Sequence, residues 1–307
     1  MTKTAFLFAG QGAQVVGMGR DLADRYPSAR AWFDRANAAL GYDLAAICFH
    51  GPEAELTRTE NAQPAIFLLS WVACQLLREQ APTLEFHAAA GLSLGECTAL
   101  ATAGAMTFED GLRLVRQRGR FMQEACEATH GGMAAVIGLD EATTRAVCAE
   151  AGVVLANLNC PGQLVISGLT ENIARACELA KAKGARRALS LPVAGAYHSP
   201  LMASAQPKLQ AALAQIPIAA PRLPVVSNVT AQPHGEPDSI RARLVEQVTS
   251  SVLWEASMRY LLAQGFMRFI ELGPGTALSG FMKRISPDAC VLNVADAASL
   301  EATVKGV

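Results

Sequence analysis

The stretch AAAGLSLGECTAL, residues 88–100, places a serine between two glycines in the pattern G-x-S-x-G at 91–95. The small apolar residues before Ser93 are typical of a buried strand, and a helical pattern begins near Gly95. A strand that turns sharply into a helix exposes such a serine oxygen as a nucleophile, and the next residue's N–H faces a forming oxyanion. The motif also fits a serine buried in ordinary packing, so the rest of the chain must supply a base and a substrate pocket.

The segments on both sides of this stretch alternate between strand-like and helical patterns. Strands are predicted at 4–10, 86–92, 224–229, 269–273 and 290–294, and helices at about 19–40, 63–80, 108–125, 198–215, 238–248 and 254–264. This alternation predicts a mostly parallel α/β sheet covered by helices.

Residues 131–195 follow a different order. The patterns predict strands at 133–139, 153–159, 163–168 and 186–194, with helices at 141–151 and 170–184. The order β-α-β-β-α-β is the ferredoxin-like split βαβ arrangement. The sequence therefore predicts a small subdomain at 131–195, inserted into a larger α/β unit formed by residues 1–130 and 196–307.

Composition narrows the class of protein. The 307 residues are 51% hydrophobic and 17% charged, enough for a sizeable core, and the net charge of −1 without long runs of one sign argues against a general nucleic-acid binder. The longest apolar stretch, 65–77, is too short to span a bilayer, and no signal peptide is evident. The eight cysteines lack zinc-site spacing and are predicted to be buried thiols. We expect a cytoplasmic protein that binds neither nucleic acid nor membranes.

A base for Ser93 has to come from the chain's five histidines. His50, His130 and His234 lie beside glycines in polar, loop-like stretches and are predicted at the surface, while His87 lies on the strand that precedes the serine. His198 follows the last strand of the small subdomain, where the chain crosses back into the larger unit. Catalytic groups gather in such clefts between domains, which favours His198.

No acidic partner for this histidine stands out. The only aspartates between Ser93 and His198 are Asp110 and Asp140, and both are predicted to cap helices. A serine–histidine pair whose imidazole is oriented by a backbone carbonyl fits the chain better than a triad.

Arg118 is an unusual charge in the helix predicted at 108–125. At 100° per residue it lies in the middle of the apolar face, whereas Arg113, Arg116 and Arg120 lie on the polar face. A buried guanidinium is costly unless it is paired, so Arg118 is expected to meet a carboxylate. Helical periodicity alone slightly favours a structural salt bridge, and the alternative is an anionic substrate held by the planar guanidinium.

Two glycine-rich stretches, 10–17 and 273–280, do not match a nucleotide-binding site. The first has Val15 where a dinucleotide fingerprint needs its third glycine, and the second lacks the lysine of a P-loop. Each follows a strand, so both are interpreted as turns that border the cleft.

Taken together, these segments resemble the malonyl-CoA:acyl-carrier-protein transacylases and the related polyketide acyltransferase domains. The resemblance covers nearly the whole chain. Its matching segments are FLFAGQGAQ (6–14), NAQPA (61–65), GLSLGE (91–96), RQRGRFMQEA (116–125), MAAVIGL (133–139), ANLNCPGQLVISG (156–168), GAYHSPLM (195–202), VVSNVT (225–230) and IELGPGTALSGFMKRI (270–285). The family implies an α/β-hydrolase-like core with an inserted ferredoxin-like βαββαβ subdomain.

The resemblance also implies roles for particular residues. Ser93 would carry the acyl group and His198 would act as its general base. The backbone N–H groups of Gln11 and Leu94 would form the oxyanion hole, and Arg118 would hold the free carboxylate of malonate. The remaining matches orient the base or line the pocket: Gln247, Asn228 and Gln63.

The family implies a malonyl group passed from malonyl-CoA to the phosphopantetheine thiol of an acyl carrier protein by a ping-pong mechanism, for fatty-acid or polyketide synthesis. No bound cofactor or metal is expected, and a monomer is expected. Because such carrier proteins are acidic, the basic clusters Lys283–Arg284 and Lys181–Arg187 are candidate docking sites. Two alternatives stay open, an acyl hydrolase that edits carrier proteins on the same scaffold and a non-catalytic carrier-binding protein. Leu92 stands where the family usually has histidine, which affects acyl preference more than reaction type.

Overall fold

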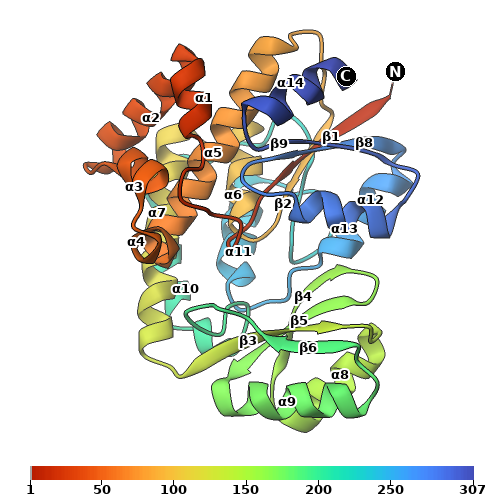
Figure 1. The fold of residues 1–307 in the computed structure, drawn as a ribbon. Coiled ribbons are helices and arrows are strands. Elements are labelled where there is room, and N and C mark those ends of the chain that lie inside the picture. The colour runs from red at the N-terminus through yellow and green to blue at the C-terminus, as the bar shows by residue number, and fades with distance from the viewer. Residues whose placement is uncertain (1) are drawn as a thin grey trace.

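The larger sheet determines where the segments around Ser93 lie. The structure is a computed structural model that describes residues 2–307, and its larger sheet has five parallel strands in the order β7-β2-β1-β8-β9 (Figure 1). The strands are β1 (Lys3–Phe8), β2 (Ala88–Gly91), β7 (Val225–Val226), β8 (Phe266–Leu272) and β9 (Cys290–Val294). This sheet confirms the predicted α/β class. Because all strands run the same way, the loops at their carboxyl ends meet at one edge.

Helices cover both faces of this sheet. They are α1 (Arg20–Arg25), α2 (Pro27–Leu40), α3 (Leu44–His50), α4 (Glu53–Thr57), α5 (Thr59–Gln80), α6 (Leu94–Thr102), α7 (Phe108–Glu127), α10 (Ala205–Ala214), α11 (Pro237–Gln247), α12 (Trp254–Ala263), α13 (Ala277–Ile285) and α14 (Ala297–Gly306). Alternate β1 residues serve different faces: Phe6 and Phe8 pack into the core with α5 to α7, and Leu7 packs into the core with α12 and α13. A strand buried on both faces is continuously apolar, which explains the run AFLFA.

A second sheet, of four antiparallel strands, forms the lower part of Figure 1. Its strands are β3 (Gly131–Ile137), β4 (Val154–Cys160), β5 (Gln163–Leu169) and β6 (Arg187–Ser190), and its helices are α8 (Glu141–Ala151) and α9 (Thr170–Ala182). The order β4-β5-β3-β6 is that of a ferredoxin-like unit and confirms the predicted insert type. The exact boundaries at 131 and 195 stay a prediction.

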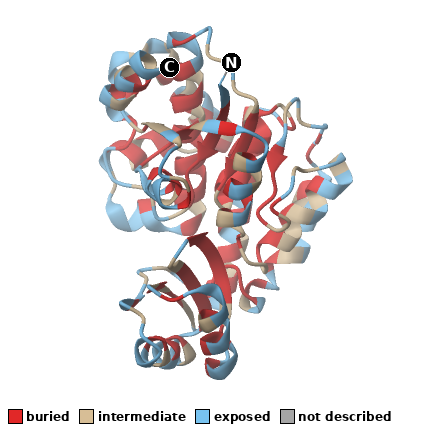
Figure 2. Ribbon diagram, turned by 90° about the vertical axis from the view of Figure 1, so that its right-hand side faces the viewer, coloured by how far each residue is buried: buried red, intermediate tan, exposed pale blue. Residues whose placement is uncertain are grey.

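Backbone hydrogen bonds join the smaller sheet to the loop that follows α11. Val252 N donates to Ala156 O at 2.8 Å, and Leu158 N donates to Val252 O at 3.0 Å. Figure 2 shows buried strands in both units, whereas exposed residues are concentrated on the outer helices. Strand β4 is thereby tied to the segment that directly follows Gln247.

Several predicted elements differ from the structure. The helix predicted at 198–215 begins only with a 3-10 turn at Pro200–Met202, because the residue before a proline is restricted to extended backbone and Ser199 has φ −138° and ψ 166°. The strand predicted at 224–229 is reduced to Val225–Val226, and the helix at 19–40 is divided at Pro27. The helices α3, α4, α13 and α14 were not predicted.

Three smaller expectations can also be compared with the structure. Asp140 caps α8, but Asp110 lies in the first turn of α7, which Thr107 caps. Seven of the eight cysteines are buried thiols, and Cys290 is exposed. Among residues 2–307, no helix is long and apolar enough to cross a membrane.

Candidate active site

Ser93 lies in a strained turn between β2 and α6. Its φ of 54° and ψ of −108° place it among only three non-glycine residues of the described chain with positive φ, the others being His198 and Ala231. Such backbone costs about 1–3 kcal/mol and persists only where the surroundings enforce it. A Cβ on Gly91 would lie 1.9 Å from Gly95 O, and one on Gly95 would lie 2.3 Å from Phe8 O. The two glycines are therefore what allows the chain to fold back on itself here.

His198 is in hydrogen-bond contact with Ser93. The serine Oγ lies 2.8 Å from His198 Nε2, and His198 Nδ1 lies 2.9 Å from the backbone oxygen of Gln247. Because a carbonyl oxygen only accepts hydrogen bonds, Nδ1 carries a proton and Nε2 of the neutral ring is free to accept the serine proton. His198 is 4% exposed, and burial together with the charge of Arg118 lowers its pKa to about 4. The imidazole is therefore a neutral base at pH 7.

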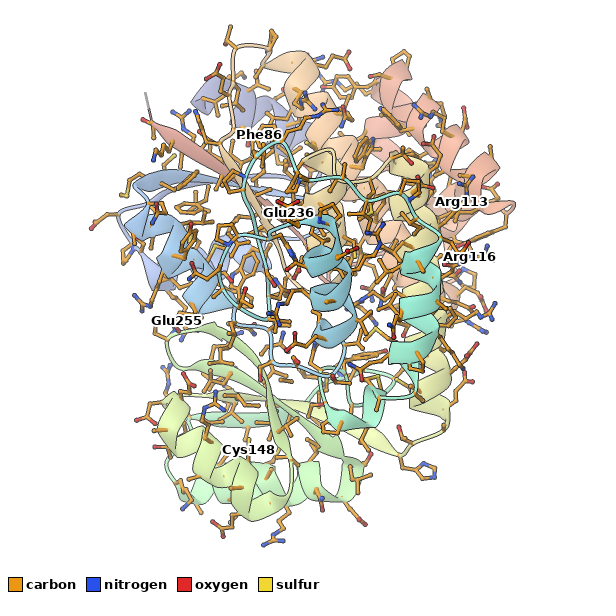
Figure 3. The ribbon with its side chains drawn as sticks, turned by 180° about the vertical axis from the view of Figure 1, so that it is seen from behind. Phe86, Arg113, Arg116, Cys148, Glu236 and Glu255 are labelled. Atoms are coloured by element: carbon orange, nitrogen blue, oxygen red, sulfur yellow. The ribbon has the colours of Figure 1, made fainter. Side chains whose placement is uncertain are left out.

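Arg118 is buried beside the same serine. One Nη2 hydrogen bond reaches Ser93 Oγ at 3.0 Å, another reaches Gln247 Oε1 at 2.9 Å, and Nη1 donates to Gln63 Oε1 at 2.8 Å. No carboxylate in residues 2–307 forms a salt bridge with it, so the structural ion pair favoured by periodicity is wrong. Its Nε–H also lacks an acceptor there. Arg113 and Arg116, by contrast, lie at the outer margin of the molecule (Figure 3).

The two backbone groups suggested for an oxyanion hole are near one another in the fold. Gln11 follows β1 and Leu94 follows Ser93, and β1 and β2 are neighbours in register up to Phe8 and Gly91. Within the described chain, neither backbone N–H donates to a protein acceptor. The side chain of Gln11 is fixed separately, since its Nε2 lies 3.4 Å from the hydroxyl of Tyr197, the residue before the base.

The side chains of Asn228 and Gln63 form hydrogen bonds that hold the other site residues in place. Asn228 Oδ1 accepts from Ser93 N at 2.6 Å and its Nδ2 donates to Gly91 O at 2.8 Å, so the amide spans both sides of the turn. Gln63 Nε2 donates to Gln11 Oε1 at 3.3 Å while its oxygen holds Arg118. All eight residues singled out from the sequence thus belong to one connected cluster.

Comparison with known proteins supports an acyl-transfer site. A profile of the acyl transferase domain matches residues 5–300. The chain is 43% identical to the malonyl CoA-acyl carrier protein transacylase of Bacillus subtilis, covering 99% of this chain and 97% of that protein, and 46% identical to that of Escherichia coli strain K12, covering 93% of each. The chain belongs to the malonyl-CoA–acyl carrier protein transacylase family. It is an acyltransferase.

The fold agrees with solved structures of this transacylase family. The malonyl-transacylase solved in complex with a type II PKS acyl-carrier protein superposes with a TM-score of 0.96 at 38% identity, over 100% of both chains. No group of three or more potential metal ligands occurs in residues 2–307.

The sequence did not reveal two further residues of this candidate site. Glu96, in the first turn of α6, is fully buried and accepts hydrogen bonds from Asn228 N and Gln247 Nε2, each at 2.8 Å. His234 Nε2 lies 2.7 Å from the other oxygen of Glu96, and its side chain is fully buried. The prediction of His234 at the surface is wrong, because the loop after β7 folds back over the turn. The acidic residue in GLSLGE was the available signal.

Proposed function

We propose that this enzyme transfers a malonyl group from malonyl-CoA to the phosphopantetheine thiol of an acyl carrier protein through an ester on Ser93. The observation that carries the proposal is the sharing of one hydroxyl: Ser93 Oγ lies 2.8 Å from the base His198 and 3.0 Å from Arg118. In a malonyl thioester the carboxylate is two bonds from the reacting carbonyl carbon. A carbonyl at Ser93 therefore brings the carboxylate to the guanidinium.

The first half-reaction begins with proton transfer from Ser93 Oγ to His198 Nε2 as the oxygen attacks the thioester carbon. The N–H groups of Gln11 and Leu94 are free to stabilise the tetrahedral oxyanion. The C–S bond then breaks, and the proton on His198 passes to the sulfur of departing CoA. The malonyl group remains as an ester on Ser93.

The second half-reaction is the same sequence in reverse. The carrier's phosphopantetheine thiol gives its proton to His198 and attacks the ester carbon, and Ser93 leaves with that proton. Arg118 supports selection of malonyl groups, because its Nε–H lacks an acceptor among the described residues and can donate to one carboxylate oxygen, while Nη2 would exchange one of its two present acceptors for the other oxygen. On the same scaffold, an editing hydrolase of neutral acyl groups would gain nothing from this buried cation.

Intact-mass measurement after mixing with malonyl-CoA tests the proposal. Wild type is expected to gain one malonyl group, and Ser93→Ala none. Arg118→Ala is expected to lower malonyl loading by about 30- to 150-fold while acetyl-CoA loading persists, because the carboxylate loses a charge-assisted contact of about 2–3 kcal/mol. Arg120→Ala, which removes an exposed arginine of the same helix paired with Glu124, is the control and should load normally.

The open alternatives give different outcomes in the same experiment. Release of free malonate at the rate of loading, without a carrier protein, would indicate a hydrolase. Absence of any adduct on wild type would indicate a binding protein and would overturn the proposal.

A further inference from the structure

The cluster leaves a buried cation without a contacting anion, and this arrangement has a structural cause. Arg118 is 2% exposed, and the described residues offer its guanidinium only amide and hydroxyl oxygens. An unpaired buried charge is normally costly. Burial accordingly lowers the pKa of Arg118, and Glu96 is the one carboxylate whose charge acts in the opposite direction. The carboxylate of Glu96 thus compensates the charge of Arg118 without contacting it, because one side chain lies between the two.

That intervening side chain is Gln247. Its Nε2 donates to Glu96 Oε2 at 2.8 Å, and its Oε1 accepts from Arg118 Nη2 at 2.9 Å. An amide has two orientations that differ by exchange of its oxygen and nitrogen. The reversed orientation would turn the NH₂ group toward the guanidinium and the oxygen toward the carboxylate, pairing donor with donor and acceptor with acceptor. Gln247 Nε2 also donates to Ser93 O at 3.0 Å and to Asn228 Oδ1 at 3.3 Å, so Glu96 and these two oxygens favour the orientation in which Gln247 holds Arg118, and Glu96 is the only charged acceptor among them.

Glu96 is itself held on both oxygens. Oε2 accepts from Asn228 N and Gln247 Nε2, and Oε1 faces His234 Nε2 at 2.7 Å. These partners come from the loop after β7 and from the end of α11, the helix that begins after Glu236 in Figure 3. The carboxylate therefore cannot rotate toward Arg118 without breaking three hydrogen bonds. A direct Arg118–Glu96 salt bridge would occupy the guanidinium edge that a substrate carboxylate needs.

We propose that Glu96 is a positioning residue for acyl-group selection: acting through Gln247, it orients and electrostatically compensates Arg118 while leaving the guanidinium open to a carboxylate on the acyl group. The inference rests on the proposed function, since it concerns the choice between malonyl and neutral acyl donors. His234 supports the same role by fixing the far oxygen of Glu96. Glu96 touches no reacting atom, so its effect should depend on Arg118.

The test compares single-turnover rates of Ser93 loading from malonyl-CoA and acetyl-CoA by intact mass. Glu96→Gln keeps the size of the side chain but removes its charge and one acceptor. It is expected to lower the malonyl-to-acetyl rate ratio at least tenfold, mainly through a higher KM for malonyl-CoA. In an Arg118→Ala background, Glu96→Gln should leave the ratio unchanged, because the residue through which it acts is gone. Glu96→Asp, which keeps the charge, should recover part of the ratio.

Glu271→Gln is the matched control. Glu271 is also a buried carboxylate with two hydrogen bonds, from Leu278 N at 3.0 Å and Ser279 N at 2.7 Å, but it caps α13 outside this cluster. The malonyl-to-acetyl rate ratio of Glu271→Gln should equal that of wild type, even if the melting temperature of the variant is lower. If Glu96→Gln does not fold, Gln247→Met tests the next link and should show the same dependence on Arg118.

Two results would overturn the inference. One is a folded Glu96→Gln protein whose ratio matches wild type. The other is an equal loss in the Arg118→Ala background, which would indicate general damage to the serine turn. Failure of the proposed function is distinct, since wild type would then form no malonyl ester.

Discussion

At the scale of single residues, His198 carries the clearest electrostatic signature. Burial, followed by the charge of Arg118, lowers its pKa from 6.5 to about 4. A base with so low a pKa stays unprotonated throughout the physiological range, and the carbonyl of Gln247 replaces the acid that a triad would use to fix the tautomer. The absence of a suitable aspartate between Ser93 and His198 had indicated this arrangement.

The pH profile of Ser93 loading should reflect this low pKa. We expect kcat/KM for acetyl-CoA to be flat from pH 8 to about 5 and to fall as pH passes through about 4, where free His198 becomes protonated. Arg118→Ala removes the second cause of the lowered pKa of His198, so the fall in kcat/KM should begin at a higher pH in this variant. Stopped-time intact-mass assays across pH provide the measurement, and identical limbs in both proteins would contradict the assignment.

The same shift makes stability depend on pH. Between pH 6.5 and 4, His198 is protonated in the unfolded chain but neutral in the folded protein. The free energy of unfolding therefore falls as the pH is lowered, and below both pKa values the loss is on the order of 3 kcal/mol. His198→Gln removes this titration. The melting temperature of wild type should therefore fall more than that of the variant as the pH is lowered from 7 to 4.5. An equal fall in both proteins would rule out the effect.

At the scale of elements, α7 has to approach α5 closely for Arg118 to reach the serine. A Cβ on Gly119 would lie 2.4 Å from Thr59 O, at the first residue of α5. Only glycine lets the two helix backbones meet at this point. Helical periodicity predicted the inward face of α7, but the contact that fixes its depth comes from a residue 60 positions away.

Gly119→Ala should therefore destabilise the fold by about 1–3 kcal/mol, as overpacking does, and slow malonyl loading by moving Arg118. The control is Gly280→Ala in α13, where a Cβ would meet nothing within 4 Å. That change should be neutral or stabilise by up to about 1 kcal/mol, because alanine favours helix over glycine. Chemical denaturation of both variants gives the comparison, and equal stabilities would contradict the close approach.

At the scale of the whole molecule, the two basic clusters suggested for carrier docking meet at one corner. Arg186 lies against Gly138, Gly138 N donates to Gly162 O at 2.9 Å, and Arg284 Nη2 is near Gly162. Arg284 is engaged with Gln163 and Pro161, and Lys181 with Glu178. Arg186 and Lys283 are exposed and form no ion pair with any of residues 2–307.

Reversing both free charges tests docking of the proposed acidic carrier. Arg186→Glu with Lys283→Glu should raise the KM for the carrier protein on the order of tenfold at low salt, and less at high salt. Loading from malonyl-CoA should be unchanged. Lys305→Glu, on α14 at the top of Figure 1, is the control. An unchanged KM in the double variant would place docking elsewhere.

What the sequence determined by itself was local: the alternation of elements, the ferredoxin-like order within 131–195, the serine turn and the inward face of Arg118, because each depends on periodicity or on the spacing of neighbouring residues. Tertiary structure alone decided what Arg118 meets, that His234 is buried, and that Glu96 anchors Gln247. These contacts join residues from 25 to 151 positions apart, and they depend on parallel strands bringing their carboxyl ends to one edge. No local pattern encodes which of those distant side chains become partners.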